Sequence, residues 1–225
     1  MTGRRAVAET QVTENYLKVV WNAREWSDGP VTVGVLATRL GLAPSSVSGA
    51  VRKLTERGLL THAKYGDIEL TDDGQRLALA TVRKHRLIET FLVEYLGYTW
   101  DEVHDEAEVL EHAVSDTFAD RLAAKLGEPD HDPHGDPIPR ADGTVHLVEQ
   151  AALDTIEPGR HVRVARVSDE DPDLLRHLAE LGITIGTALE VHRRQDAIGT
   201  IDVDYNGACH ILGLTAARSI RVSPN

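Results

Sequence analysis

The chain has 225 residues, 41% of them hydrophobic, and a formal net charge of −12. This length allows one large domain or two to three small ones, and the apolar content is sufficient for buried cores. Because the sequence lacks an 18-residue apolar run, an apolar leader and a second cysteine beside Cys209, we expect a cytoplasmic protein without membrane helix, signal peptide or internal disulfide.

The first part of the sequence has the pattern of a winged helix-turn-helix. An apolar stripe predicts a helix from residue 13 to the SDGP turn at 27–30. A second helix is expected over 32–40 and a third, with a proline in its first turn, over 44–57. The stretch LLTHAKYGDIELTDDG that follows is typical of two strands joined by a turn, which would be the wing.

The polar face of the helix at 44–57 is suited to DNA. Residues 1–75 hold nine basic and nine acidic side chains, whereas 76–225 hold 15 basic and 27 acidic ones and carry all of the net charge. DNA contact depends on the local field, so a neutral first segment can approach phosphates. Small hydroxyls at a helix start can reach base edges or phosphates, and basic side chains further along can hold the DNA backbone. The predicted DNA contacts are Ser45, Ser46, Ser48, Arg52 and Lys53, with Lys64 from the wing. The alternative is a helix-turn-helix with a structural role only.

Residues 75–140 are expected to be mostly helical and to bind metal. Histidines and glutamates recur there at spacings of three or four, which places them on one face of a helix. These residues are His104, Glu108, Glu111 and His112 in one helix over 101–126, and His85 and Glu89 in the helix before it. Carboxylate and imidazole form the ligand set of a divalent transition metal, and a cation would relieve the repulsion between the carboxylates. The alternative is a solvated acidic helix face.

The helical region is also expected to form a dimer, and a loop and a β-rich domain are expected to follow it. The helices have more apolar surface than a helix pair would hide, and a DNA reader of this type needs two copies to span a two-fold operator, so we expect a homodimer. The stretch 127–143 is rich in Pro, Gly and Asp and is expected to be a solvated loop, in which His131 and His134 are free rather than bound to metal. From 153 onward, alternating apolar residues and tight turns predict five short strands in a small SH3-like barrel, with a helix over 171–182.

The complete pattern resembles the diphtheria-toxin-repressor family, in its manganese-responsive branch from actinobacteria. The resemblance is strongest in TENYLKVVWNAREW, in VRKHRLIETFLVEYLGYTWDEVHDEAEVLEHAVSD and in DPHGDPIPRADG. It implies a mainly α protein with a small β part and three domains. These are a winged helix-turn-helix over 1–74, a helical metal-binding and dimerisation domain over 75–150 and an SH3-like domain of the FeoA type over 151–225. It also implies a repressor rather than an enzyme, which binds palindromic operator DNA as a homodimer when Mn²⁺ is bound.

The resemblance further implies two Mn²⁺ sites in each subunit. The primary site would consist of Asn15, Glu108, Glu111 and His112. The ancillary site would consist of His85, Glu89 and His104, with Asp171 from the third domain. Iron-type members have cysteine at the position of Glu108, and the harder carboxylate suits Mn²⁺, although Fe²⁺, Co²⁺ and Zn²⁺ should also bind in vitro. Asn15 replaces an aspartate of many manganese-type members and would ligate through its neutral carbonyl oxygen. The alternatives are an iron-responsive repressor and a metallohydrolase with Glu106 as its base.

Overall fold

The computed structural model describes residues 2–27, 29–63, 66–146 and 148–224, with side chains from Thr10 onward. The predicted DNA contact Lys64 lies outside these residues. The chain divides into two compact units, which are described one after the other. Unit 1 comprises Met1–His85, Glu111–Asp116 and Pro139–Thr144, and unit 2 comprises Arg86–Leu110, Thr117–Ile138 and Val145–Asn225.

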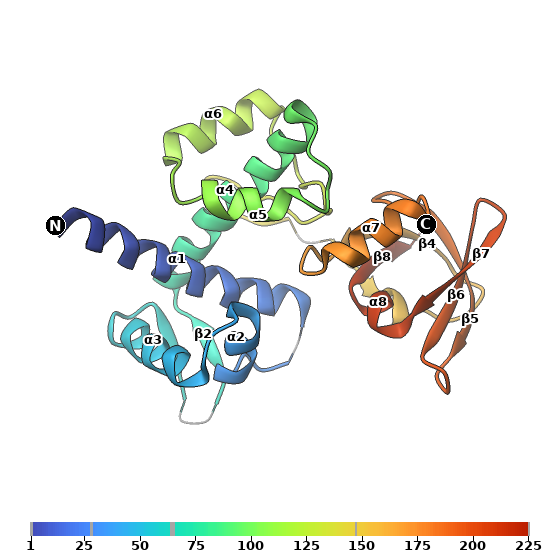
Figure 1. The fold of residues 1–225 in the computed structure, drawn as a ribbon, viewed down its shortest axis with the longest axis horizontal. Helices are drawn as coiled ribbons and strands as arrows, with labels where there is room; N and C mark the ends of the chain where they lie inside the picture. Colours follow the sequence, from blue (N-terminus) through green and yellow to red (C-terminus); the bar gives the residue numbers. More distant parts are fainter. Residues whose placement is uncertain (1, 28, 64–65, 147, 225) are drawn as a thin grey trace. The chain divides into compact units, whose positions relative to one another are not determined.

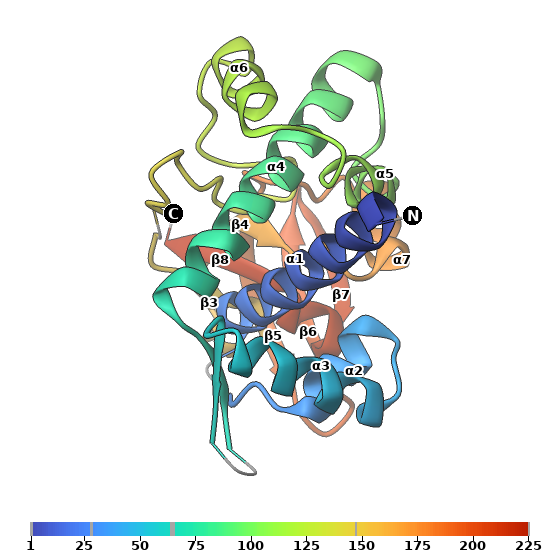
Figure 2. The same cartoon turned by 90° about the vertical axis from the view of Figure 1, so that its left-hand side faces the viewer.

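Unit 1 is built around a winged helix-turn-helix, whose helices and hairpin are visible in Figure 1. Its elements are α1 (Thr2–Trp26), α2 (Val33–Leu40), α3 (Pro44–Glu56), β1 (Leu60–His62), β2 (Ile68–Leu70) and the first half of α4 (Asp72–Leu96). The helix signals act as predicted, because the hydroxyl of Thr32 caps α2, Gly41 ends it in a left-handed conformation and Pro44 opens α3. β1 and β2 pair antiparallel, and this hairpin extends below α3 in Figure 2.

The core of unit 1 contains side chains of α1 as well as of α2 and α3. Leu17 and Val20 of α1, Leu36 of α2, and Val47 and Val51 of α3 are all fully buried in one cluster. On α3 the buried side chains occur at i, i+4 and i+7, so the serines and basic residues between them face solvent. α1 is therefore part of the structure that supports α3, the helix predicted to contact DNA.

The expected helix over 101–126 is two helices. α5 (Val103–Leu110) ends before Glu111, a turn covers 111–115, and α6 (Asp116–Leu126) follows. Ser115 followed by Asp116 is a helix-start signal, because short polar side chains satisfy the free N–H groups of a first turn. The period of 3.6 residues does not reveal this break, which places Glu111 and His112 in a turn.

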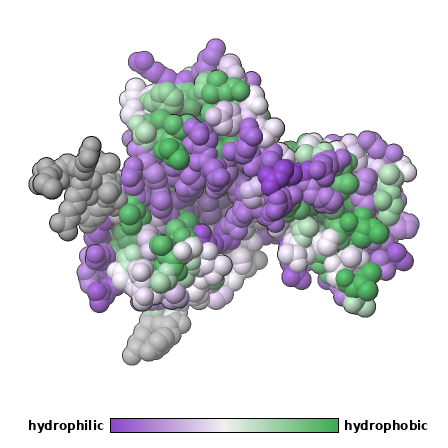
Figure 3. Space-filling view, in the orientation of Figure 1, coloured by the Kyte–Doolittle hydropathy of each residue, from purple (hydrophilic) through white to green (hydrophobic). Residues whose placement is uncertain are grey.

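Large apolar side chains are exposed on the helices of unit 2. Tyr95 and Leu96 at the end of α4, Val109 of α5 and Phe118 of α6 are 47–70% exposed. Figure 3 shows hydrophobic side chains gathered over the region of α6. An exposed apolar surface of this kind is typical of a protein–protein interface.

Among the described residues, the helices are all too short or too polar to cross a membrane.

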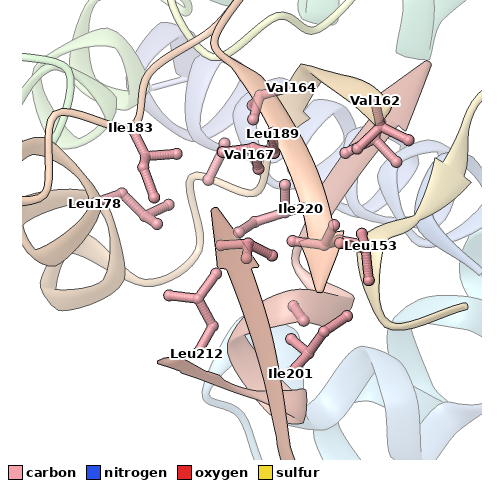
Figure 4. Packing of buried hydrophobic residues seen from close by; sticks show 14 of the residues in the cluster. Leu153, Val162, Val164, Val167, Leu178, Ile183, Leu189, Ile201, Leu212 and Ile220 are labelled. Atoms are coloured by element: carbon pink, nitrogen blue, oxygen red, sulfur yellow. The ribbon is translucent and has the colours of Figure 1, made fainter. Parts of the chain in front are cut away.

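The remainder of unit 2 is a six-stranded antiparallel sheet with the strand order β3-β8-β4-β5-β6-β7. The strands are β3 (Ala151–Ala152), β4 (His161–Val167), β5 (Ala188–Gln195), β6 (Thr200–Tyr205), β7 (Ala208–Gly213) and β8 (Ile220–Pro224), with the short helices η1 (Leu153–Thr155), α7 (Pro172–Glu180) and α8 (Leu214–Arg218). Within the described strands, the edge strands β3 and β7 do not pair with each other, so the expected small SH3-like domain is an open sheet of six strands rather than five. Its core includes Leu153, Val164, Leu178 and Ile201, which converge in Figure 4.

The loop over 127–143 is packed rather than solvated. His134 is fully buried, and its carbonyl oxygen accepts a hydrogen bond of 2.9 Å from the backbone N–H of Val167 on β4. Gly135 has φ +83, and a Cβ at this position would lie 2.0 Å from the carbonyl oxygen of Ala165. The expectation of a solvated His134 is therefore wrong, because the loop needs a glycine to approach β4 so closely. His131 is exposed, as expected.

We predict that Gly135→Ala lowers the free energy of unfolding by roughly 2–4 kcal/mol, because it combines left-handed strain with a steric clash against β4. Gly127→Ala is the matched control, since Gly127 has φ +82 but nothing within 4 Å of a Cβ. It should cost only about 1–2 kcal/mol. Urea unfolding measures the free energy of unfolding of both variants. An equal loss of stability in Gly135→Ala and Gly127→Ala would contradict the close approach of the loop to β4.

Candidate metal centres

Unit 1 contains a cluster of polar side chains centred on Glu111, hereafter the Glu111 cluster. Its members are Glu14, Asn15 and Lys18 of α1, His85 of α4, and Glu111 and His112 of the turn after α5. The carboxylate of Glu111 is fully buried and accepts from Lys18 Nζ at 2.7 and 2.8 Å and from His85 Nδ1 at 2.6 Å. Burial raises the pKa of Glu111, but the hydrogen bond from His85 and the charges of Lys18 and His85 outweigh it and hold that pKa below its ordinary value.

The orientation of His112 leaves one ring nitrogen suited to a metal. Nδ1 lies 2.7 Å from Oε2 of Glu14, and because a carboxylate only accepts, Nδ1 carries the proton. Nε2 then has its lone pair available, and among the described residues it has no hydrogen-bond partner although it is buried. The carbonyl oxygen of Asn15 is likewise buried without a partner in the described part of the chain. A carboxylate that orients a histidine in this way is the usual second partner of a metal-binding imidazole.

Unit 2 contains a second group, hereafter the Glu89 cluster, which comprises Glu89 of α4, His104 of α5, Asp132 and His134 of the 127–143 loop, and Asp169 of the turn after β4. The potential ligand atoms of Glu89, His104 and Asp169 lie within 4.8 Å of one another, as do those of Glu89, Asp132 and His134. His104 Nδ1 is 2.8 Å from Asp169 Oδ2 and 3.5 Å from Glu89 Oε1. Glu89 is completely buried and belongs to both groups.

His134 is held with one nitrogen turned toward Glu89. Its Nε2 lies 2.6 Å from the carbonyl oxygen of Trp100, to which it must donate. Its Nδ1 is 3.8 Å from Glu89 Oε2 and forms no hydrogen bond to any described residue. The loop is further fixed by Arg86, which donates to the carbonyl oxygen of Pro137 at 2.7 Å. This is a preorganised imidazole beside two buried carboxylates.

The charges of the Glu89 cluster favour cations. Burial opposes protonation of His104, but the hydrogen bonds and charges of Asp169 and Glu89 outweigh it and raise the pKa of His104 to about 11. In the same way Glu89, Asp132 and Asp169 overcome burial and raise the pKa of His134 to about 10. Burial and the charges of Asp136 and Glu89 raise the pKa of Asp132. Positive charge in this cluster is stabilised whether protons or a metal ion supply it.

The predicted ligands divide between the two clusters. Glu111, His112 and Asn15 are in the Glu111 cluster, and Glu89 and His104 are in the Glu89 cluster. His85 belongs to the helix that bears Glu89 but hydrogen bonds to Glu111. Glu108 is on α5, with Oε1 3.7 Å from His104 Nε2. Asp171 caps α7 by accepting from the backbone N–H groups of Asp173 and Leu174, and Asp169 instead contacts His104.

Sequence reasoning did not identify Glu14, Lys18, Asp132 or Asp169 as members of these clusters. The DPHGD motif around His134 was a possible signal, since it combines a histidine with carboxylates and a glycine that allows close packing. Asp169 belongs to the acidic run SDEDPD, in which several carboxylates follow one another. The sequence does not indicate which of them is turned inward. Glu14 and Lys18 show the helical spacing of α1, but their partners lie far away in the sequence.

Both clusters are chemically suited to a divalent cation. The Glu111 cluster offers a carboxylate, an amide oxygen and an imidazole nitrogen, of which the last two are otherwise unsatisfied among the described residues. The Glu89 cluster offers carboxylates and two imidazoles. Oxygen and imidazole donors without thiolate favour borderline to hard transition-metal ions.

The predicted DNA-contact surface lies on α3. Ser45, Ser46, Ser48, Arg52 and Lys53 are all exposed. Arg52 is within 3.9 Å of Glu56 one turn later, a weak surface pair that would not prevent a phosphate contact. The winged helix and the two clusters together define the class of metal-dependent DNA-binding regulators.

Comparisons with known proteins agree with this class. Family models match "Iron dependent repressor, N-terminal DNA binding domain" at residues 9–68, "Iron dependent repressor, metal binding and dimerisation domain" at 71–140 and "FeoA domain" at 151–224. The diphtheria toxin repressor of Corynebacterium diphtheriae is 30% identical over 93% of this chain and 96% of its own. The solved structure of a manganese-dependent transcriptional repressor in complex with manganese is 50% identical, with a TM-score of 0.90, over 95% of this chain and 100% of its own. ScaR with bound Zn²⁺ is 34% identical, with a TM-score of 0.83, over 95% of this chain and 99% of its own.

The chain belongs to the diphtheria-toxin-repressor family of metal-dependent transcriptional repressors. This family consists of DNA-binding regulators rather than enzymes, so the metallohydrolase alternative is wrong. The expected order of a DNA-binding, a helical dimerisation and a FeoA-type domain is confirmed.

We predict that His104 stabilises the metal-free protein most at low pH. Its pKa rises from 6.5 in the unfolded chain to about 11 in the folded one, so its contribution is complete below pH 6.5 and is lost as the pH rises toward 11. The destabilisation caused by His104→Asn, measured by urea unfolding in chelator, should therefore shrink between pH 6.5 and 9. The exposed His131→Asn serves as control. A constant effect of His104→Asn across this range would contradict the pairing with Asp169 and Glu89.

Proposed function

We propose that this chain is a manganese-responsive repressor, which binds palindromic operator DNA as a homodimer when Mn²⁺ is bound. The observation that carries this proposal is the Glu111 cluster. It connects α1, which supplies core residues to the winged helix, with the turn between α5 and α6. A cation bound by side chains of both segments would therefore act directly on the DNA-binding unit.

The proposed metal follows from the ligand chemistry. A site with Asn15, Glu108, Glu111 and His112 is rich in oxygen, and a carboxylate at position 108 in place of a thiolate favours Mn²⁺ over softer ions. The similar repressor solved in complex with manganese supports this choice, whereas the Zn²⁺ complex of ScaR indicates that other divalent ions enter sites of this family. We assign a second ion to the Glu89 cluster, so two Mn²⁺ ions per subunit are expected.

Metal binding would regulate DNA affinity by shifting a conformational equilibrium. When bound, the ion supplies positive charge that draws the ligands together. Glu111 and His112 would then fix the position of α1 through Asn15, and Glu14 would keep the imidazole of His112 in the ligating tautomer. A ligand set that is complete only in the DNA-binding arrangement stabilises that arrangement. By linkage, operator DNA must tighten metal binding by the same factor.

The homodimer provides the second DNA-reading helix. The exposed apolar side chains of α4, α5 and α6 are suited to a dimer interface, and the matching family model is described as a dimerisation domain. A two-fold dimer presents two copies of α3 to the two halves of a palindrome. Ser45, Ser46 and Ser48 would contact bases and Arg52, Lys53 and Lys64 would contact phosphates.

We predict that saturating Mn²⁺ raises affinity for DNA selected from random sequences by about tenfold or more relative to chelator. Fluorescence anisotropy measures this ratio. His112→Ala and Glu111→Gln should reduce the ratio toward one, whereas the exposed His131→Ala should leave it unchanged. Equal DNA affinity of the natural chain in chelator and in Mn²⁺ would contradict a metal-dependent switch.

We also predict a difference between the basic residues and serines of α3. Arg52→Ala or Lys53→Ala should weaken binding to all sequences and lower the salt dependence by roughly one unit of slope for each lost phosphate contact. Ser45→Ala and Ser46→Ala should mainly reduce discrimination between operator and random DNA. Arg218→Ala, which removes the same charge from α8, is the control. Unchanged affinity and specificity in all four α3 variants would contradict the assigned surface.

A further inference from the structure

Lys18 is a buried cation that takes no part in the metal-sensing mechanism proposed above. It is 3% exposed, and its ammonium lies 2.7 and 2.8 Å from the two carboxylate oxygens of Glu111, which is 1% exposed. An ammonium is rarely buried unless it is paired, and Glu111 satisfies it. The same carboxylate is a ligand in the proposed metal site.

Lys18 and a metal ion would compete for the same oxygens. A carboxylate has about four lone-pair positions. Lys18 contacts both oxygens, and His85 Nδ1 donates to Oε2 at 2.6 Å. The Nε2 atom of His112, the other expected ligand, lies 3.4 Å from Oε1. An ion held by His112 and Glu111 must therefore displace the Lys18 ammonium from Oε1 or lie close to its positive charge.

We propose that Lys18 sets the metal affinity of the Glu111 cluster: its ammonium competes with the divalent ion for Glu111 and raises the concentration at which the ion binds. This inference rests on the proposed function in one respect, that Glu111 is a ligand. Charge repulsion inside a buried site is weakly screened, so a fixed positive charge at this distance has a large effect.

The side chain of Lys18 is suited to displacement. It has four flexible methylenes and a compact charge, in contrast to the rigid fork of arginine. Glu14 precedes Lys18 by one turn of α1, and a glutamate and a lysine at this spacing and in this order attract each other. A second carboxylate is therefore within reach of the ammonium when it leaves Glu111.

The inference requires opposite effects of Lys18 on the two forms of the protein. Without its ammonium, Glu111 is a buried charge with fewer partners, so the metal-free protein should lose stability. The same carboxylate, freed of its competitor, should bind a divalent ion more tightly. A Lys18 with only a structural role would lower stability equally with and without metal and would leave the metal affinity unchanged.

Calorimetric titration with MnCl₂, combined with thermal unfolding in chelator and in Mn²⁺, tests the inference. All proteins carry His104→Ala, which removes one of the two imidazoles of the Glu89 cluster and weakens that site, so that the first ion bound in the titration reports on the Glu111 cluster. Lys18→Met and Lys18→Gln should bind Mn²⁺ about tenfold or more tightly than this parent. Their unfolding temperature in chelator should be lower, and its increase on adding Mn²⁺ should be larger.

Two controls accompany these variants. Lys18→Arg keeps the charge and should bind Mn²⁺ no more tightly than the parent does. Lys84→Met removes an equal charge from the same unit but from a pair with Asp116, at 2.7 Å, and should change neither measurement. Lys18→Gln keeps a hydrogen-bond donor for Glu111 and decides the question if Lys18→Met does not fold.

The outcomes separate the inference from the proposed function. If the parent binds Mn²⁺ and the Lys18→Gln variant binds it no more tightly, the role of Lys18 is overturned and the metal switch stands. If tighter binding also appears in Lys84→Met, the effect is one of net charge and the inference fails. If the parent and all variants fail to bind Mn²⁺, both the inference and the proposed function are overturned.

Discussion

The buried carboxylate of Glu111 is the constraint on which unit 1 depends. It joins three segments that are distant in the sequence, through Lys18 of α1 and His85 of α4. An ionised carboxylate without partners in a protein interior is strongly unfavourable, so these segments must meet wherever Glu111 is buried. Since Leu17 beside Lys18 belongs to the core that supports the recognition helix, the charge at Glu111 is mechanically connected to the DNA-binding surface.

Glu89 has the corresponding place in unit 2. Its carboxylate lies among side chains from α5, from the 127–143 loop and from the turn after β4, and it is as deeply buried as Glu111. In the sequence, Glu89 follows His85 of the Glu111 cluster by one turn of α4.

Local sequence signals were sufficient for the elements whose stability is local. The cap at Thr32, the proline at position 44 and the alternation in 160–167 predicted their helices and strand because propensity and burial agree there. Histidine and glutamate spacing predicted Glu111 and His112 as ligands on a helix, whereas the structure places both in the turn after α5. Spacing could not pair Lys18 with Glu111, 93 residues away, since this contact depends on tertiary folding. The burial of His134 was missed because loop composition normally indicates solvent, and here a glycine allows the loop to pack against a strand.

A divalent ion and Lys18 are proposed to compete for Glu111, and Glu89 is proposed to anchor a second ion. Anomalous X-ray diffraction from Mn²⁺-loaded crystals tests both proposals most directly, because it locates manganese independently of the protein atoms. We expect one manganese peak bound by Glu111 and His112, with the Lys18 ammonium displaced from the shared oxygen, and another bound by Glu89 with His104 or His134. Manganese found only at other positions, with the contact between Lys18 and Glu111 intact, would show that the ion and Lys18 do not compete for this carboxylate.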